Sequence, residues 1–256
     1  MSDRSNNLQQ TKGYFKMLSD RGNAEVQKSL YLLVDESKLF EECMYFQSLV
    51  VESVIRSAAP ITDDGLRSAI ALACYTYDML LCGWTSLTRG FYAAAFHFVR
   101  SIDQATVTEV AVTIDPNIAR KFWEDKLDDG DAAKALQIAI EKEDQDFGKE
   151  WGRRRIHLRK LYNKYMHPSR TAVSPSIIIA ADFQSATPTI GGMFIEKQCR
   201  LIGRLYADLA FKAAVDASQA FKPVLPPDGK LKQKFDELVG WGKPLIDSWG
   251  KEMGFS

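Results

Sequence analysis

The sequence lacks an excess of charge of either sign. Its 256 residues include 33 lysines and arginines and 33 aspartates and glutamates, so the formal net charge at pH 7 is zero. A chain without net charge has no overall field that draws it to nucleic acid or to an anionic membrane surface. A contact with either partner would therefore have to come from a local patch of basic residues.

Long apolar runs are missing as well. The first 16 residues contain no apolar stretch of the kind that a secretory signal has. The most apolar region, 66–99, is interrupted by Asp78, Gly83, Arg89 and Gly90, and it lacks the roughly 20 consecutive apolar residues of a membrane-spanning helix. We therefore expect a cytoplasmic protein that does not enter a membrane.

Cysteine and histidine are scarce. The four cysteines lie far apart and the three histidines are scattered, so no pair has the short spacing of a zinc site. The acidic stretch 128–131 lacks the alternating ligands of a calcium loop and is typical of a turn with a helix N-cap. The sequence thus predicts neither a metal nor a cofactor. We expect all four cysteines to be reduced and buried: Cys43, Cys74, Cys82 and Cys199.

Helical periodicity is what the sequence has in abundance. Apolar residues recur at spacings of three and four along most of the chain, which is typical of amphipathic helices. Prolines, glycines and N-cap residues such as Asp63 divide this pattern. The predicted helices cover 24–59, 66–114 with a break at Gly83 or Gly90, a short segment after Asp115, 131–147, 151–166, 194–221 and 230–249. These observations predict an all-α, multi-helix bundle.

Two segments depart from the helical pattern. Residues 176–182 are rich in β-branched side chains and 187–194 contain turn formers, which predicts a small β-hairpin insert around 175–193. Residues 1–22 are polar and typical of a flexible N-terminal segment. We expect residues 23–256 to form a single helical-bundle domain, because the chain has no internal repeat and its length fits one core.

The segment 90–113 is apolar around most of its circumference, so we expect a central helix. Its narrow polar stripe carries His97, Arg100, Gln104 and Thr108, with Asp103 one turn after Arg100. Two interpretations of Arg100 and Asp103 remain open. They form an ordinary ion pair at the i, i+3 spacing, or Asp103 orients Arg100 so that its guanidinium binds a phosphate or a developing oxyanion.

A second polar set ends the helix 151–166. Lys160 and Asn163 precede His167 by seven and four residues and share its side of the helix, and Pro168 stops the helix there. An imidazole near neutrality suits a general acid or base. It suits equally a cap that hydrogen-bonds the last carbonyls of the helix.

The segment 152–160 is basic, and it follows the largely acidic segment 141–150. Pairs at the i, i+4 spacing, such as Glu150 with Arg154, would neutralise much of its charge. We interpret the basic segment as a solvated, self-paired surface in preference to a nucleic-acid patch, since no aromatic residues interleave it.

Two stretches resemble the HEPN superfamily of small helical bundles. RGFYAAAFHFVRSIDQA (89–105) is similar to a family helix with an arginine followed three residues later by an acid. LYNKYMHPS (161–169) is similar to a helix that ends in Asn-x-x-x-His-Pro-Ser. Many HEPN proteins are metal-independent ribonucleases of toxin–antitoxin or phage-defence systems and act as dimers. Their motif has an arginine, four to six residues, and a histidine; in this chain only Lys160 is basic at those positions, and Arg159 lies one residue further away.

The resemblance implies a homodimeric protein directed at RNA or a nucleotide. In that role His167 would act as acid or base and Arg100, Lys160 and Arg159 would hold phosphate. Asp103 and Asn163 would orient these groups. The alternative is a non-catalytic helical module that dimerises or binds a partner protein, in which the same residues form a buried polar network that fixes the packing.

Overall fold

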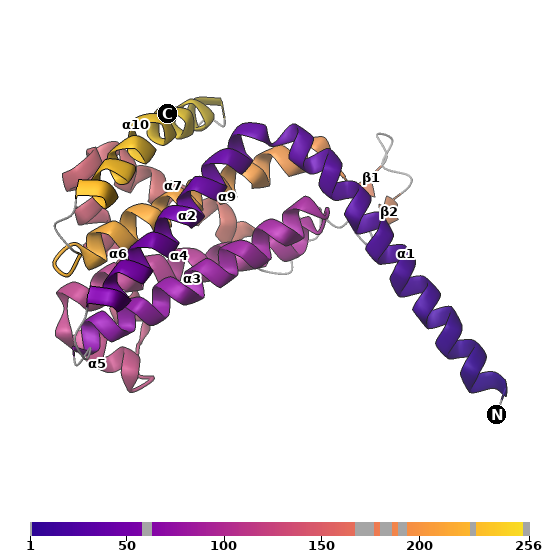
Figure 1. Ribbon diagram of the computed structural model, residues 1–256, viewed down its shortest axis with the longest axis horizontal. Helices are drawn as coiled ribbons and strands as arrows, with labels where there is room; N and C mark the ends of the chain where they lie inside the picture. Colours follow the sequence, from indigo (N-terminus) through magenta and orange to yellow (C-terminus); the bar gives the residue numbers. More distant parts are fainter. Residues whose placement is uncertain are drawn as a thin grey trace.

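The computed structural model describes residues 2–57, 63–166, 177–179, 186–188, 194–225 and 229–252, without the side chains of 2–15, 18, 150, 161–166 and the two strands. In these ranges the chain is an all-α bundle with one two-stranded sheet (Figure 1). Its elements are α1 (Ser2–Leu32), α2 (Val34–Ser57), α3 (Asp64–Thr88), α4 (Tyr92–Ile114), α5 (Pro116–Trp123), α6 (Asp129–Phe147), α7 (Lys149–Met166), β1 (Ile177–Ile179), β2 (Ala186–Pro188), α9 (Glu196–Phe221) and α10 (Gly229–Glu252).

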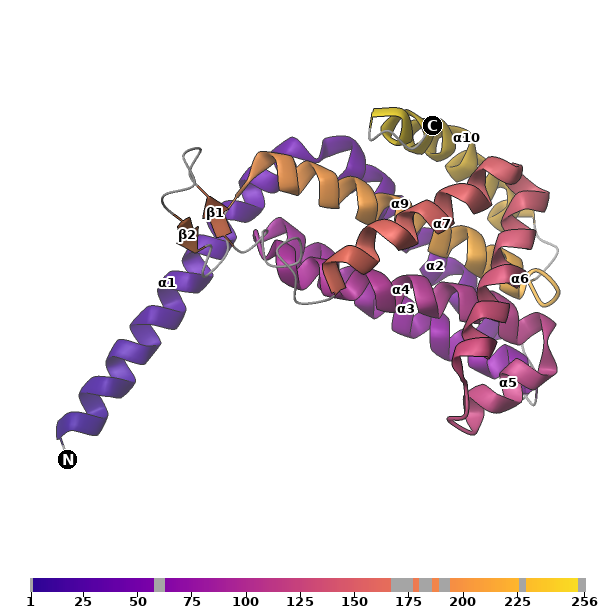
Figure 2. The same cartoon turned by 180° about the vertical axis from the view of Figure 1, so that it is seen from behind.

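Helix α4 is the centre of the bundle, as its apolar circumference predicts. It packs against α3, α9, α6, α7 and α5 (Figures 1 and 2). Helix α9 is also largely buried. Small residues along it let α2, α3 and α4 pack closely against it. Together these helices enclose one continuous hydrophobic core that also takes in α10. The predicted all-α bundle is confirmed.

The helix ends follow local sequence signals. The Asp63 side chain accepts a hydrogen bond from the Leu66 amide at 2.7 Å and caps α3. Gly90, with a positive φ of 78°, separates α3 from α4, so the predicted break lies there. Asp115 caps α5. The acidic stretch 128–131 begins α6 with a reciprocal capping box, which confirms its interpretation as a turn and an N-cap.

The structure corrects two expectations about the helices and one about the burial of the cysteines. The predicted helix 24–59 is two helices, interrupted at Leu33, whose side chain packs on Gly203 of α9. Gly83 is no break but lies inside α3. Cys74 and Cys82 are exposed, whereas Cys43 and Cys199 are buried as expected.

The two segments outside the helical pattern are only partly described. Residues 2–22 are the first part of α1, which extends away from the bundle (Figure 1), so residue 22 is not a boundary of secondary structure. Strands β1 and β2 pair antiparallel, Ile178 opposite Thr187. Much of 175–193 lies outside the described residues. Among the described residues, none of the helices combines the length and the hydropathy that a membrane span requires.

We predict that Gly83→Ala destabilises the fold, because the new methyl group would overlap the hydroxyl and ring of Tyr206. That hydroxyl donates a buried hydrogen bond of 2.6 Å to the Ala95 carbonyl. Urea unfolding should show a loss of about 1–3 kcal/mol. Gly240→Ala in α10 is the matched control, since nothing lies within 4 Å of its added methyl. An equal loss in both variants would contradict this packing argument.

Candidate functional site

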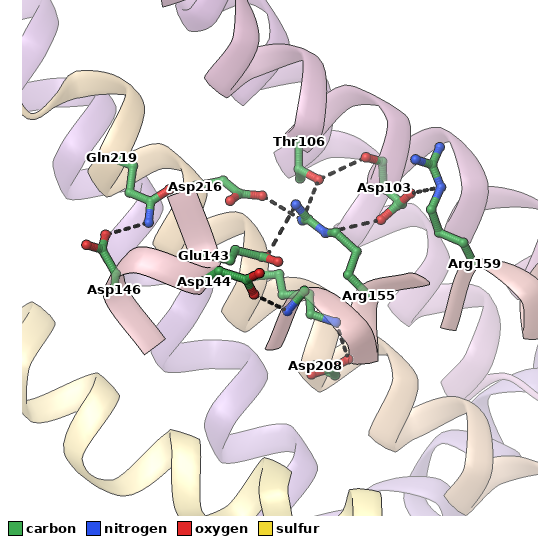
Figure 3. Close-up of polar contacts among 12 residues, drawn as sticks. Asp103, Thr106, Glu143, Asp144, Asp146, Arg155, Arg159, Asp208, Asp216 and Gln219 are labelled. Atoms are coloured by element: carbon green, nitrogen blue, oxygen red, sulfur yellow. Dashed lines mark hydrogen bonds and ion pairs between the residues drawn. The ribbon is translucent and has the colours of Figure 1, made fainter. Parts of the chain in front are cut away.

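A fully buried arginine lies between four helices. The side chain of Arg155, on α7, is 1% exposed and contacts carboxylates of α4, α6 and α9 (Figure 3). Its Nη2 donates to Asp216 Oδ2 at 2.7 Å, and its Nη1 lies 3.3 Å from Glu143 Oε1. Its Nε lies 3.6 Å from Asp103 Oδ1. One guanidinium thus joins three acidic side chains that are distant in the sequence.

Close backbone contact brings α7 to this position. Gly148, with a positive φ of 90°, ends α6, and α7 begins at the next residue. Gly152 on α7 donates its backbone N–H to Asp144 Oδ1 at 3.1 Å. A methyl at residue 152 would stand 2.6 Å from that oxygen and from Ile140. Glycine therefore allows α7 to lie against α6 with Arg155 facing inward.

A second buried ion cluster adjoins the first on α7. Arg154 is buried, and its guanidinium lies 3.6 Å from Asp208 of α9 and 3.7 Å from Asp247 of α10. Its Nη1 also donates to the Ile246 carbonyl at 3.0 Å. Lys212, likewise buried, contacts Asp208 at 3.0 Å. The two clusters anchor consecutive arginines of α7 to different sides of the core.

The buried charges do not cancel if every group is ionised. Five carboxyls are buried here, Asp103, Glu109, Glu143, Asp208 and Asp216, against three buried cations, Arg154, Arg155 and Lys212, and the partly exposed Arg159. Asp247 is more exposed and also pairs with Lys243. Burial raises the pKa of Glu109 well above its ordinary value. Burial also raises the pKa of Glu143 to about 7, although Arg155 opposes the shift. These raised pKa values favour a protonated carboxyl in the cluster at neutral pH.

Arg159 connects this core to the surface. Its Nε lies 2.9 Å from Asp103 Oδ2, so Asp103 is shared between Arg155 and Arg159. The Arg159 side chain is 21% exposed, whereas that of Asp103 is 3% exposed. Figure 3 shows the two terminal nitrogens of Arg159 pointing away from Asp103. A buried carboxylate thus forms an ion pair on the Nε side of the arginine, and the terminal N–H groups are directed elsewhere.

The structure places some predicted site residues together and separates others. Asp103 and Arg159 are in contact. No ion pair of the described residues joins Arg100 to Asp103, so the predicted ion pair between these two residues of α4 is wrong. Arg100 and Lys160 are exposed. Asn163 lies in α7, with its side chain undescribed, and His167 lies outside the described residues.

Arg100 and Lys160 nevertheless lie on the same side of the α4–α7 pair. The two helices run antiparallel (Figure 2), since Thr106 and Asp103 of α4 meet Arg155 and Arg159 in the opposite order. At 100° per residue, Arg100 is turned about 60° from Asp103, and Lys160 about 100° from Arg159. In antiparallel helices these two turns lead to the same side. We call this edge, with Arg100, Arg159 and Lys160, the α4–α7 edge.

The basic segment 152–160 is not the solvated, self-paired surface that its composition predicts. Arg154 and Arg155 are buried and pair with acids of other helices. The reason is periodicity: Trp151, Arg155 and Leu158 share one face of α7, and this face is the buried one. Within the segment, Arg153, Ile156, His157 and Lys160 are exposed and Arg159 is partly exposed.

Sequence reasoning missed the acids that receive these arginines, although signals were present. Asp208, Lys212 and Asp216 recur every four residues along α9, where their neighbours are small or apolar. Ala135, Ala139 and Glu143 form a similar line on α6, and all three are buried. Charged residues at the core spacing of a helix indicate a buried ionic cluster rather than a surface.

Comparison with known proteins finds no match for this chain. No protein-family model, no curated protein and no solved structure matches the chain.

We predict that Arg155→Met destabilises the fold strongly, because it leaves Asp216, Glu143 and Asp103 without their shared cation. Urea unfolding should show a loss of about 3–5 kcal/mol. Arg153→Met, on the exposed side of the same helix, removes the same charge and should change stability by about 0.5 kcal/mol or less. Similar losses in the two variants would mean that the buried ion pairs do not hold the helices together.

We predict that Glu143→Gln removes a pH dependence of stability. The folded pKa of Glu143 is raised from 4.5 to about 7, so the unfolded chain loses this proton first as pH rises. Wild-type stability from this group is therefore present below pH 4.5 and declines toward pH 7, by up to about 3 kcal/mol. The variant should match wild type near pH 4.5 and exceed it at pH 8 in urea titrations. A difference between the two proteins that stays constant with pH would contradict the shift.

Proposed function

We propose that this chain is a HEPN-like protein directed at RNA or a nucleotide, and that it binds phosphate at the α4–α7 edge. The observation that carries the proposal is the 2.9 Å contact between Asp103 and Arg159 Nε. The role expected of Arg100, an arginine oriented by Asp103, fits Arg159 instead. Arg100 and Lys160 add two exposed cations on the same side of the helix pair.

The chemistry of the edge suits a phosphate group. A guanidinium held by Nε presents its remaining N–H groups in a planar fork, which matches two phosphate oxygens. Because Asp103 is itself fixed by Arg155, Arg159 loses little conformational freedom on binding. The partial exposure of Arg159 gives a ligand access, while the buried Asp103 is shielded from solvent.

The catalytic form of this proposal is a metal-independent ribonuclease. His167 would act as general acid or base, and Asn163 would orient the substrate or the imidazole. The resemblance to HEPN proteins supports this assignment, since both residues belong to the Asn-x-x-x-His-Pro-Ser stretch. The same resemblance supports a homodimer.

One observation favours a second candidate, a non-catalytic module that dimerises or binds a partner protein. Arg155, Glu143 and Asp216 are sealed from solvent, so they can contact no ligand and act only on packing. In this alternative, the Asp103–Arg159 contact is the outermost member of a network that fixes the arrangement of α4 and α7.

We predict that Arg159→Gln weakens binding of a labelled trinucleotide by about tenfold or more, because it removes a charge-assisted contact. Fluorescence anisotropy measures the affinity, and Arg56→Gln on α2, another exposed arginine, is the matched control. Arg100→Gln, which leaves the buried network intact, should also weaken binding. If neither variant changes the affinity, or if wild type binds no nucleotide, the proposed phosphate site is wrong. The non-catalytic module is then the function that the structure favours.

The catalytic form is tested separately with His167→Ala. This variant should retain the wild-type melting temperature and lose cleavage of a fluorogenic RNA in the presence of a metal chelator. A variant that cleaves as fast as wild type would contradict the assignment of His167.

A further inference from the structure

We propose that the exposed side of α7 is the path of an extended single strand of RNA that continues outward from the phosphate at Arg159. This inference rests on the proposed function and extends it from a phosphate group to a polymer. We call this surface the outer face of α7; its residues are Arg153, Ile156, His157 and Lys160, all of them exposed.

The charge of the outer face is not balanced within its helix. Helix α7 contains one acidic residue, Glu150, against the seven lysines and arginines 149, 153, 154, 155, 159, 160 and 164. The acids that reach α7 from other helices are engaged by its buried or half-buried arginines, Arg154, Arg155 and Arg159. Among the described residues, no ion pair includes Arg153 or Lys160. Arg153 and Lys160 are exposed, so they can contact an external polyanion.

The arrangement favours a polymer over a single nucleotide. Arg153, His157 and Lys160 follow one another at spacings of four and three residues, which are rises of about 6 and 4.5 Å along the helix axis. This stripe adjoins Arg159 and points away from the core, so a strand bound at Arg159 can place further phosphates along it. A mononucleotide can fill only one end of such a row.

Ile156 adds a feature that fits a nucleic acid strand better than a membrane. It is 40% exposed and lies between the basic residues, where a splayed base or a ribose can cover it. A helix that inserts into a lipid surface needs a broad apolar face, and the outer face of α7 offers only this one apolar side chain. The chemistry of a basic row with a single apolar contact is therefore that of a single-stranded RNA surface.

The test compares two labelled probes by fluorescence anisotropy over a series of salt concentrations. One probe is an oligouridine of about twelve nucleotides, long enough to span a typical single-strand site; the other is a trinucleotide. Wild type should bind the longer probe more tightly. Arg153→Gln should lower the slope of log affinity against log salt by about 0.7 for the longer probe, the value for one lost phosphate contact.

Arg153→Glu should reduce the affinity for the oligouridine on the order of tenfold or more, because it adds repulsion, and leave trinucleotide binding unchanged. Arg56→Glu on α2 reverses the same charge elsewhere and should change neither. Equal losses in Arg153→Glu and Arg56→Glu would reduce the effect to net charge and overturn the inference.

Two further outcomes separate this inference from the proposed function. If wild type binds the oligouridine no more tightly than the trinucleotide, the outer face is not an RNA path, while the phosphate site at Arg159 stands. If wild type binds neither probe, both fail. Binding of phosphatidylserine vesicles that Arg153→Glu abolishes, without binding of the oligouridine, would assign the outer face to a membrane instead.

Discussion

The fold depends on the burial of one guanidinium among acids from three other helices. Arg155 brings α7 into contact with Asp103 of α4, Glu143 of α6 and Asp216 of α9. Burying such a charge is favourable only when its partners are in place, since an unpaired buried ion is strongly destabilising. The four helices must therefore assemble together in one register. The apolar core provides the driving force for collapse, and the ion pairs select which faces meet.

Helix α7 combines two roles that its composition does not separate. Its buried or half-buried arginines neutralise acids from four other helices, and its exposed basic residues face solvent. Arg159 lies at the boundary between the two, where Asp103 is shared with Arg155. One carboxylate thus contacts both a buried arginine and a partly exposed one. This shared acid links the packing of the bundle to the chemistry proposed for the α4–α7 edge.

The sequence predicts the helices well and the polar site only in part. Periodicity and caps such as Asp63 and Gly90 depend on neighbouring residues, so most helices could be located from the sequence. The i, i+3 spacing predicts that Asp103 pairs with Arg100 on the same helix, whereas Asp103 pairs with Arg159. The true partner lies 56 positions away on α7. Pairing between helices follows from tertiary packing, which local spacing does not encode.

The surplus of buried acid over buried base has a thermodynamic consequence. Burial raises the pKa values of Glu109 and Glu143, which favours a protonated carboxyl in the folded core at neutral pH. In the unfolded chain these side chains are hydrated and ionise, so unfolding discharges hydrogen ions into the buffer. The heat absorbed in calorimetry then includes the buffer's own heat of protonation. Two buffers of the same pH but different protonation enthalpies will give this one protein two apparent enthalpies of unfolding.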